Sequence, residues 1–458
     1  MTTAADSSPL DGNDIDAGVD SLGVVGVGYV GLTTGACLAA LGHRVVCGDI
    51  DAERIERLRA GVIPIVEEGL APLVAEGIAS GRLTFVVGAA EVARQATIVF
   101  LCVPTPQDED GSADLSFVQA AAAEIAPVLA SGSVVVNKST VPVGSTHVVS
   151  AVLRRGDVAV VSNPEFLREG TAVHDFLHPD RVVVGSADRA AAHRVADLYR
   201  SLDTRVLVTD AASAETIKYA ANGFLAMKIS FINEIARLCE SVGADVLEVA
   251  HGIGLDPRIG EQFLRPGPGW GGSCFPKDSR AVVQIALNCD FDLMTVRSVI
   301  ESNETHREAM VDKILGYASS HPTVAVWGLT FKAGTDDLRD SPAVEIARAL
   351  QSRGAAVSAY DPTCVGEISS GRQSQLGGIA LCPSAVDAAR GADVVAVLTE
   401  WEEFRRIDFR EVSKAMRGDC IVDLRNVLPS AALLQAGLRL DALGRPNPRP
   451  GNPSDTNG

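Results

Sequence analysis

The sequence lacks paired cysteines and an excess of basic residues, and each absence excludes a class of protein. Its nine cysteines stand singly, with no CxxC pair and no metal-ligand spacing, so we expect reduced, intracellular thiols and no metal. Lys and Arg total 40 against 58 Asp and Glu, which gives a formal charge of −18. This charge repels polyanions, and nucleic acid is therefore not expected as a partner. An anionic substrate requires a local cluster of Lys and Arg.

A membrane span and a secretory signal are not expected either. The uncharged run from Ser21 to Gly42 is long enough to cross a bilayer, but it contains six glycines and two threonines and follows an acidic leader. We therefore expect a cytoplasmic location without membrane contact. No short-period repeats and no coiled-coil heptads are visible in the chain.

The length of 458 residues and the pattern of apolar runs predict several domains. Residues 1–19 and 446–458 are small and polar, and we expect both to be disordered. From 20 to 212, apolar strands alternate with amphipathic stretches, which predicts a parallel sheet with helices on both faces. Six runs are typical of buried strands: LGVVGVG, HRVVCGDI, TIVFLCVP, SVVVNKST, VAVVSNP and RVVVGS.

A helical middle segment, 213–320, separates this lobe from a second one, 321–445. Within it, a helix from about Ala214 to Ser241 is long enough to connect two domains. The strand and helix alternation resumes near Thr323, with a helix predicted over Pro342–Arg353. The predicted fold class is α/β, with two Rossmann-like, doubly wound parallel-sheet domains joined by a long central helix and a helical region.

A glycine-rich loop follows the first predicted strand. Gly26, Gly28 and Gly31 form a G-x-G-x-x-G pattern between an apolar strand and an amphipathic stretch, the arrangement that holds a dinucleotide pyrophosphate at a helix N-terminus. Asp49 lies at the end of the second strand, where an acidic residue binds the ribose hydroxyls. With no arginine expected nearby, it favours NAD over NADP. Asp51 is better explained as a helix N-cap.

The segment from Gly269 to Asp278, GWGGSCFPKD, is the most informative stretch. Its glycines free the backbone to wrap a ligand, and Cys274 precedes Lys277 and Asp278, which could influence thiolate formation. A cysteine taken at random is more often a small buried hydrophobe. Glycine crowding and adjacent charge favour a reactive residue here.

Five motifs together resemble the UDP-glucose/GDP-mannose dehydrogenase family over nearly the whole ordered chain. In chain order they are GVGYVG, NKSTVPVG at 137–144, SNPEFLREGTA at 162–172, KYAAN at 218–222 and GWGGSCFPKD. FPKD after the cysteine resembles the UDP-glucose branch, although the GDP-mannose branch has a similar signature. The UDP-N-acetylmannosamine branch usually has His where this chain has Ser273. Trp270 and Asn137 also depart from the commoner family residues.

The resemblance implies oxidation of UDP-glucose to its 6-carboxylate by two NAD, through a thiohemiacetal and a thioester on cysteine. It makes Cys274 the nucleophile, and Lys218 and Asn222, four apart on one helix face, the groups around the reacting oxygen. Glu165 and Thr140 match residues implicated in hydrolysis and in positioning water. The full set implied as catalytic is Cys274, Lys218, Asn222, Asp278, Glu165 and Thr140.

The resemblance also implies binding residues for both ligands. Arg258 matches a residue that reaches a neighbouring subunit's sugar site, so a homodimer or a higher homo-oligomer, with the middle helices as the interface, is expected. The implied cofactor residues are Gly26, Gly28, Tyr29, Val30, Gly31, Asp49, Val103, Pro104, Thr105, Thr140, Glu169, Lys277 and Arg339. The implied substrate residues are Glu165, Phe166, Leu167, Lys218, Asn222, Arg258, Phe263, Leu264, Gly271, Phe331, Lys332 and Arg425. A GDP-mannose or UDP-N-acetylhexosamine dehydrogenase, or a non-catalytic NAD-binding regulator, are the alternative interpretations.

Overall fold

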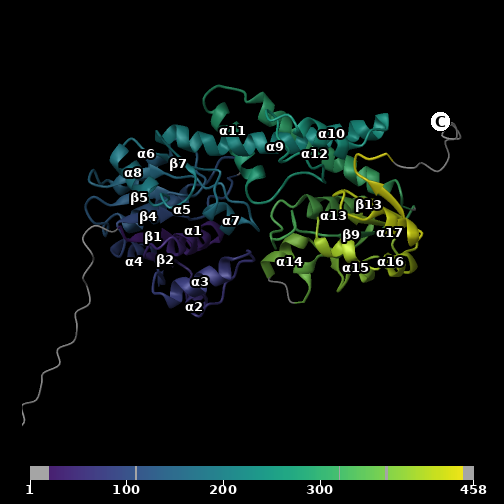
Figure 1. Ribbon diagram of the computed structural model, residues 1–458, viewed down its shortest axis with the longest axis horizontal. Coiled ribbons are helices and arrows are strands. Elements are labelled where there is room, and N and C mark those ends of the chain that lie inside the picture. The colour runs from purple at the N-terminus through teal and green to yellow at the C-terminus, as the bar shows by residue number, and fades with distance from the viewer. Residues whose placement is uncertain (1–19, 109–110, 319, 367–369, 447–458) are drawn as a thin grey trace, which may run out of the picture.

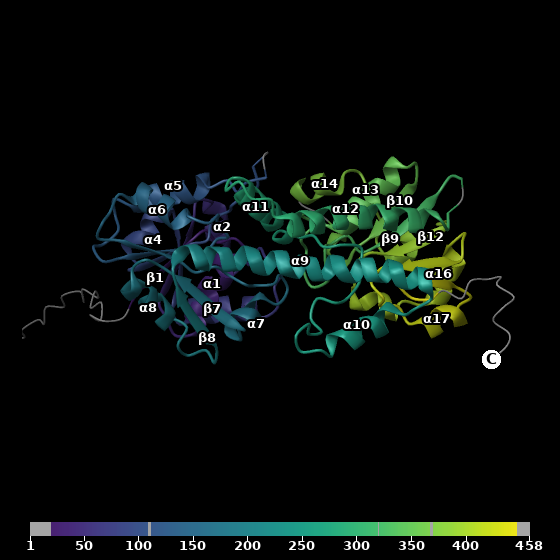
Figure 2. The same cartoon turned by 90° about the horizontal axis from the view of Figure 1, so that it is seen from above.

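The computed structural model describes residues 20–108, 111–318, 320–366 and 370–446. Two α/β lobes lie along the long axis of the molecule, and one long helix, α9 (Ala211–Val242), runs past both of them (Figures 1 and 2). The termini expected to be disordered, 1–19 and 446–458, lie outside the described residues except for Pro446.

The first lobe is built on an eight-stranded sheet in the order β3-β2-β1-β4-β5-β6-β7-β8. The neighbouring strands pair in parallel, apart from a single antiparallel contact between β6 and β7 at Ser162 and Gly185. All six predicted strands are present. The edge strands β3 and β8 were not predicted, because side chains along both are partly exposed and the apolar signal is weak. The strands are β1 (Leu22–Val25), β2 (Val45–Asp49), β3 (Leu83–Val87), β4 (Ile98–Leu101), β5 (Val134–Asn137), β6 (Ala159–Ser162), β7 (Arg181–Gly185) and β8 (Arg205–Thr209).

Helices cover both faces of this sheet, which explains why its central strands are almost wholly apolar. One core packs helices α1, α2, α3, α7 and α8 against Leu22 and Val24, and the other packs α4, α5 and α6 against Val25 and Val99. Strand β1 has β2 on one side and β4 on the other, so a crevice opens at its carboxyl end. The helices are α1 (Tyr29–Ala40), α2 (Ala52–Arg59), α3 (Leu70–Ala79), α4 (Ala89–Arg94), α5 (Ser116–Ile125), α6 (Ser145–Leu153), α7 (Ala172–Leu177) and α8 (Arg189–Asp197).

The second lobe repeats the design with a six-stranded parallel sheet in the order β11-β10-β9-β12-β13-β14. Helix α13 begins at Pro342, as predicted, because proline is favoured in a first helical turn. The strands are β9 (Thr323–Trp327), β10 (Ala356–Tyr360), β11 (Ala380–Leu381), β12 (Val394–Val397), β13 (Cys420–Asp423) and β14 (Arg439–Ala442). The helices are α13 (Pro342–Ser352), α14 (Ser370–Leu376), α15 (Ala385–Ala388), α16 (Phe409–Ala415) and α17 (Ser430–Gln435).

Helix α9 joins the lobes and is longer than predicted at both ends. Asp210 caps it by accepting a hydrogen bond from the Ser213 amide at 2.8 Å, and Gly243 ends it in the left-handed conformation. Its first turn packs on β7, and Ile232 and Ala236 enter the core of the second lobe. The other middle helices are α10 (Val246–Gly254), α11 (Phe275–Leu287) and α12 (Met294–Leu315).

The uncharged run from Ser21 to Gly42 folds into β1, the glycine loop and α1. Among the described residues, every helix is too short or too polar to cross a bilayer.

Candidate active site

The glycine loop has the geometry that a dinucleotide needs. Gly26 adopts a φ of +92°, and a Cβ there would lie 2.7 Å from the Cys102 carbonyl oxygen. A Cβ on Gly31 would lie 1.8 Å from the Gly26 oxygen, so Gly31 allows α1 to pack on the loop. Gly28 has nothing within 4 Å of an added Cβ, so its backbone is open to a ligand.

Asp49 is held against this loop, and the expectation that no arginine lies near it is wrong. Its Oδ2 accepts a hydrogen bond from the Val27 amide at 2.9 Å. Arg54 lies 3.4 Å from the same oxygen, because Asp51 caps α2 and the first turn carries Arg54 back toward the strand end. An arginine is therefore near Asp49 after all. It is paired with the carboxylate, and about two-fifths of its side chain is exposed.

A cavity of about 560 Å³ runs from Asp49 to Cys274. All the residues expected to bind cofactor line it except Gly31, which lies behind the loop. Thr105 and Thr140 share one wall, where the Thr105 hydroxyl donates to the Thr140 carbonyl at 2.9 Å. Phe117 and Glu124 of α5 and Ser139 also line the cavity and were not predicted to do so. The sequence of α5 shows only the pattern of an ordinary helix after a strand. The open Gly28 backbone and the Asp49 carboxylate both fit a dinucleotide.

Cys274 lies at the inner end of this cavity, at the N-cap of α11, with Pro276 in the first turn of the helix. Burial raises the pKa of its thiol to about 11, the Glu165 and Asp278 charges add to the rise, and Lys218 opposes it. The thiol is therefore protonated at neutral pH in this state. Lys277 does not lower the pKa of the thiol, because its ammonium is paired with Asp278 at 2.7 Å.

Lys218 and Glu165 form a buried ion pair beside the cysteine. Their charged atoms are 2.8 Å apart, and the two side chains are 4% and 5% exposed. Burial alone raises the pKa of Glu165, but the Lys218 charge and the Leu167 amide, 2.6 Å away, lower it overall. The pKa of Lys218 is raised, because Glu165 and nearby acidic groups outweigh its burial. Glu165 is thus a buried carboxylate rather than a solvated loop residue.

Asn222 lies one helical turn after Lys218 and holds the second carboxylate. Its amide donates to Asp278 at 2.6 Å, and Asp278 is 1% exposed. The two donors therefore lie on one face of α9, as their spacing predicts. Each is engaged with a carboxylate, and the charges of Glu165, Lys218 and Asp278 all act on Cys274.

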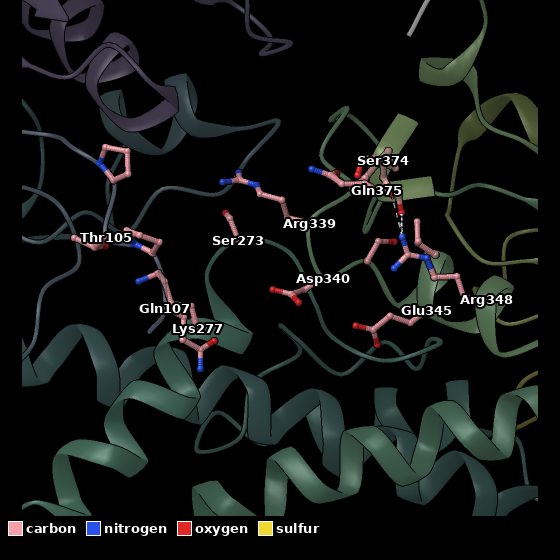
Figure 3. Close-up of a pocket in the computed structure, with 15 residues that line it drawn as sticks. Thr105, Gln107, Ser273, Lys277, Arg339, Asp340, Glu345, Arg348, Ser374 and Gln375 are labelled. Carbon is pink, nitrogen blue, oxygen red and sulfur yellow. Dashed lines mark hydrogen bonds between the residues drawn. The ribbon is translucent and has the colours of Figure 1, made fainter. Parts of the chain in front are cut away.

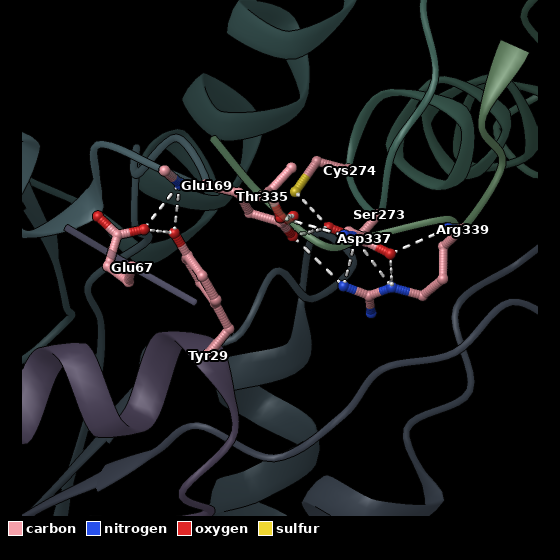
Figure 4. A network of polar contacts seen from close by, with 9 residues as sticks. Tyr29, Glu67, Glu169, Ser273, Cys274, Thr335, Asp337 and Arg339 are labelled. Carbon is pink, nitrogen blue, oxygen red and sulfur yellow. Dashed lines mark hydrogen bonds and ion pairs between the residues drawn. The ribbon is translucent and has the colours of Figure 1, made fainter. Parts of the chain in front are cut away.

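A polar network connects the cysteine to both lobes (Figure 4). The Ser273 hydroxyl lies 3.5 Å from the Cys274 sulfur and donates to Glu169 at 2.7 Å. From the second lobe, Arg339 and the Thr335 hydroxyl lie 3.3 and 3.4 Å from Glu169. Ser273, Thr335 and Asp337 were missed by the sequence analysis.

Gly170, which follows Glu169 in the chain, belongs to the same network. Its amide donates to the Tyr29 hydroxyl at 2.8 Å and to Glu67 at 2.7 Å, and Tyr29 also donates to Glu67 (Figure 4). A Cβ on Gly170 would lie 2.9 Å from the Gly334 oxygen, so main chain meets main chain between the lobes.

A second cavity, of about 630 Å³, opens between the lobes beside this network (Figure 3). Thr105 and Lys277 line it from one side, and Arg339, Glu345 and Arg348 line it from the other. Ser273 lines both cavities. The second cavity therefore comes within one residue of Cys274 along the chain.

Several expected substrate residues gather at the boundary between the lobes. The Phe331 ring packs on Gly272 of the cysteine loop, where a Cβ would lie 2.9 Å from the ring. Arg425 donates to the Phe331 carbonyl at 2.8 Å and lies beside Gly267 of that loop. Burial lowers the pKa of Lys332, partly offset by the Glu169 charge.

The remaining expected substrate residues do not form one group in the structure. Gly271 approaches the second lobe closely, since a Cβ there would lie 2.0 Å from the Asp340 oxygen. Phe263 has a positive φ of +64° and its ring lies 6.2 Å from that of Phe275, while Leu264 is buried. The Phe166 ring stacks under the Arg181 guanidinium at 3.7 Å. Arg258 stands apart, paired with Asp256 and with 87% of its side chain exposed.

Comparison with known proteins matches each part of this architecture to a named domain. Residues 20–203 match the NAD binding domain, 212–305 the central domain and 325–430 the UDP binding domain of one family. An NAD-binding lobe joined to a UDP-binding lobe defines an NAD-dependent oxidoreductase. The chain belongs to the UDP-glucose/GDP-mannose dehydrogenase family.

Individual relatives cover nearly the whole chain. It is 46% identical to UDP-glucose 6-dehydrogenase of Rhizobium meliloti (strain 1021), over 93% of this chain and 99% of that protein. It is 43% identical to UDP-glucose 6-dehydrogenase TuaD of Bacillus subtilis (strain 168), over 95% of each. A UDP-glucose dehydrogenase structure from Pyrobaculum islandicum superposes with a TM-score of 0.83 at 36% identity, covering 93% of this chain and 97% of that one.

Proposed function

We propose that this chain oxidises UDP-glucose to UDP-glucuronate with two NAD, and that Cys274 holds the half-oxidised sugar between the two steps. The observation that carries the proposal is the continuous cavity from Asp49 to Cys274. The relatives named UDP-glucose 6-dehydrogenase, at 46% and 43% identity over nearly the whole chain, support the choice of sugar nucleotide.

Taking a primary alcohol to an acid removes two hydrides, and bound NAD supplies the acceptor for one hydride at a time. A free aldehyde would be lost while the cofactor is exchanged. Attack by the Cys274 sulfur prevents this by forming a thiohemiacetal, and the second oxidation leaves a thioester that water cleaves. The residues of this chain therefore have to bind the sugar, hold a covalent adduct and admit water in turn.

Lys218 and Asn222 stabilise the negative charge that develops on the C6 oxygen. An ammonium has three N–H donors and a carboxamide two, so each residue keeps a donor beyond the one given to Glu165 or Asp278. Donors fixed in advance by buried carboxylates need no reorganisation when charge appears. Glu165, with Thr140 nearby on the cavity wall, positions the hydrolytic water.

The diphosphate of the substrate needs local positive charge in a protein of net charge −18. Lys332 and Arg425 of the second lobe supply it, and both belong to the group of residues around Phe331 and the cysteine loop. An arginine offers paired donors that match phosphate oxygens.

An assay with three sugar nucleotides tests the proposal. NADH release is measured in parallel with UDP-glucose, GDP-mannose and UDP-N-acetylmannosamine. We expect two NADH for each UDP-glucose and at least tenfold lower kcat/KM for the other two, because a mismatched base or hexose substituent costs more than about 1.4 kcal/mol. A preference for either competitor, or one NADH for each sugar, would contradict the proposal.

We also propose that a second copy of this chain covers one face of α9. Phe224, Phe231 and Leu238 recur every seven residues along that face and are 58%, 49% and 54% exposed. Such a stripe on a helix is what a self-complementary dimer buries. The exposed Arg258 would then reach the neighbouring subunit's site.

Sedimentation and complementation test this assembly. We expect Phe231→Glu to convert a dimer into a monomer. Mixing Cys274→Ser with Arg258→Ala should restore activity, because one mixed site then has an intact cysteine and Arg258 of the partner subunit. A monomeric parent protein, or no restored activity, would refute the shared site.

The reactive thiol supports a cytoplasmic location. All nine cysteines are free in the structure, as is usual for proteins of a reducing compartment.

A further inference from the structure

A short hydrogen-bonded chain leads away from the catalytic sulfur. The Cys274 sulfur lies 3.5 Å from the Ser273 hydroxyl, and that hydroxyl donates to Glu169 Oε1 at 2.7 Å (Figure 4). A serine that donates to a carboxylate presents its lone pairs to the remaining neighbour, which here is the thiol. The geometry therefore allows the S–H to donate to Ser273 while Ser273 donates to Glu169.

The other two carboxylates near the sulfur already accept short hydrogen bonds at both oxygens. Both oxygens of Glu165 accept strong hydrogen bonds, one from Lys218 at 2.8 Å and one from the Leu167 amide at 2.6 Å. Both oxygens of Asp278 are likewise taken, by Asn222 at 2.6 Å and by Lys277 at 2.7 Å. The donors to Glu169 other than Ser273 are longer, with Arg339 at 3.3 Å from Oε1 and Thr335 at 3.4 Å from Oε2.

Glu169 is different, because its neighbours favour a proton. Burial raises its pKa to about 7, and the like charge of Asp337 adds to the rise. Ser273 and Arg339 oppose the rise, Arg339 from 3.3 Å. The remaining ionisable groups that face it are Lys332 and Tyr29. Glu169 is thus balanced between its two forms near neutral pH.

We propose that Ser273 relays the thiol proton of Cys274 to Glu169 as the sulfur attacks the aldehyde. The inference rests on the proposed function and adds a proton path to it. A bond forms between sulfur and C6, and the carbonyl electron pair moves to the C6 oxygen, which faces Lys218. The thiol proton passes to Ser273, and the Ser273 proton passes to Glu169.

The path runs backward when water cleaves the thioester. Water adds its oxygen to C6 and its protons pass to solvent as the carboxylate forms. The bond between sulfur and C6 breaks, the sulfur keeps the electron pair, and Glu169 returns the proton to it through Ser273. Cys274 therefore releases one proton and regains it within each turnover. No oxidant or further reactant is needed for the relay.

Charge explains why the site needs such a path. Losing the thiol proton to solvent would add a negative charge to the buried site, whereas transfer to Glu169 neutralises one carboxylate as the sulfur gains electron density. The pKa values of the thiol and Glu169, about 11 and about 7, differ by about 4. The proton therefore stays on the sulfur at rest, and its transfer accompanies attack.

The 6-aldehyde of UDP-glucose tests the relay, because its two reactions differ in their need for the thiol. Oxidation of the aldehyde by NAD passes through attack by Cys274, whereas reduction of the aldehyde by NADH does not. For Ser273→Ala we expect oxidation to fall at least about 10²-fold, the range of general acid–base catalysis. Any loss of reduction should be far smaller than the loss of oxidation, because reduction does not use the thiol.

Two further measurements separate a relay from a structural role. Ser273→Thr keeps the hydroxyl and should restore oxidation. The parent oxidation rate should rise with pH through about 7, as Glu169 loses its proton, and this rise should vanish in Ser273→Ala and in Glu169→Gln. Ser186→Ala is the matched control, since Ser186 is 3% exposed and donates to the Val160 carbonyl at 2.8 Å outside the site.

Equal loss of oxidation and reduction in Ser273→Ala, or oxidation at the parental rate, would overturn the relay. A parent protein inactive with both UDP-glucose and its aldehyde would instead refute the proposed function. The two failures are therefore distinguishable.

Discussion

Replacing Lys218 by Met should destabilise the protein in a manner that depends on pH. The substitution leaves the Glu165 carboxylate 5% exposed without its partner at 2.8 Å. Breaking a buried ion pair by removing one member costs about 3–5 kcal/mol, because the remaining charge stays uncompensated. We expect a loss of this size at pH 8, measured as the free energy of unfolding from urea denaturation.

The sign of the pH effect follows from Glu165. In the parent its folded pKa is lowered from 4.5, so the pair's stability is present above that value and is lost as pH falls through the folded pKa. In Lys218→Met, burial is no longer opposed by Lys218 and the folded pKa rises above the unfolded one. Stability is then fully present below the unfolded pKa and is lost as pH rises through the folded one. The variant should therefore lose less stability at pH 5 than at pH 8.

Two controls sharpen this prediction. Lys414→Met breaks an ion pair of the same 2.8 Å length whose side chains are 72% and 56% exposed, and it should change stability little. Lys218→Met combined with Glu165→Leu should cost less than Lys218→Met alone, because no buried charge remains. A loss below about 1 kcal/mol at pH 8, or an equal loss at both pH values, would refute the reasoning.

The remaining predictions concern the cysteine and the cofactor loop. Cys274→Ser should abolish release of the acid while binding UDP-glucose normally in calorimetry, and full turnover would contradict the covalent route. Gly28→Ala should fold normally but raise the Kd for NAD at least about tenfold, since the new methyl group meets only ligand. Gly31→Ala should instead lower the free energy of unfolding by about 1–3 kcal/mol, because its Cβ would lie 1.8 Å from the Gly26 oxygen; equal unfolding curves would exclude this. Asp49→Ala should raise the KM for NAD by about 10- to 100-fold, the value of hydrogen bonds to a charged group, and an unchanged KM would remove Asp49 from the ribose site.

Features that lie within one short stretch of sequence were predictable. The glycine loop, its strand and Asp49 are local, and their spacing alone indicates a dinucleotide site. Helix α9 was predicted from its apolar period, although Asp210 places its start earlier. The edge strands β3 and β8 escaped because their exposed positions dilute the apolar signal.

Properties that arise between distant segments could not be predicted. Ser273 meets Glu169 across 104 residues, and Thr335 meets Glu169 across 166. The raised pKa of Cys274 depends on burial by several elements and on charges from two other segments, so the adjacent Lys277 was misleading. Arg54 reaches Asp49 through the first turn of α2, which sequence distance alone does not indicate.

The meeting of Gly170 with Gly334 has a consequence for how the enzyme opens. Where two bare stretches of main chain abut, no interlocked side chains have to leave their rotamers before the surfaces part. Such a seam can separate and close again without repacking, which would suit the cofactor exchange that the proposed covalent route requires. A larger residue at Gly170 would push the two main chains apart, whereas one at Gly334 would extend into open space.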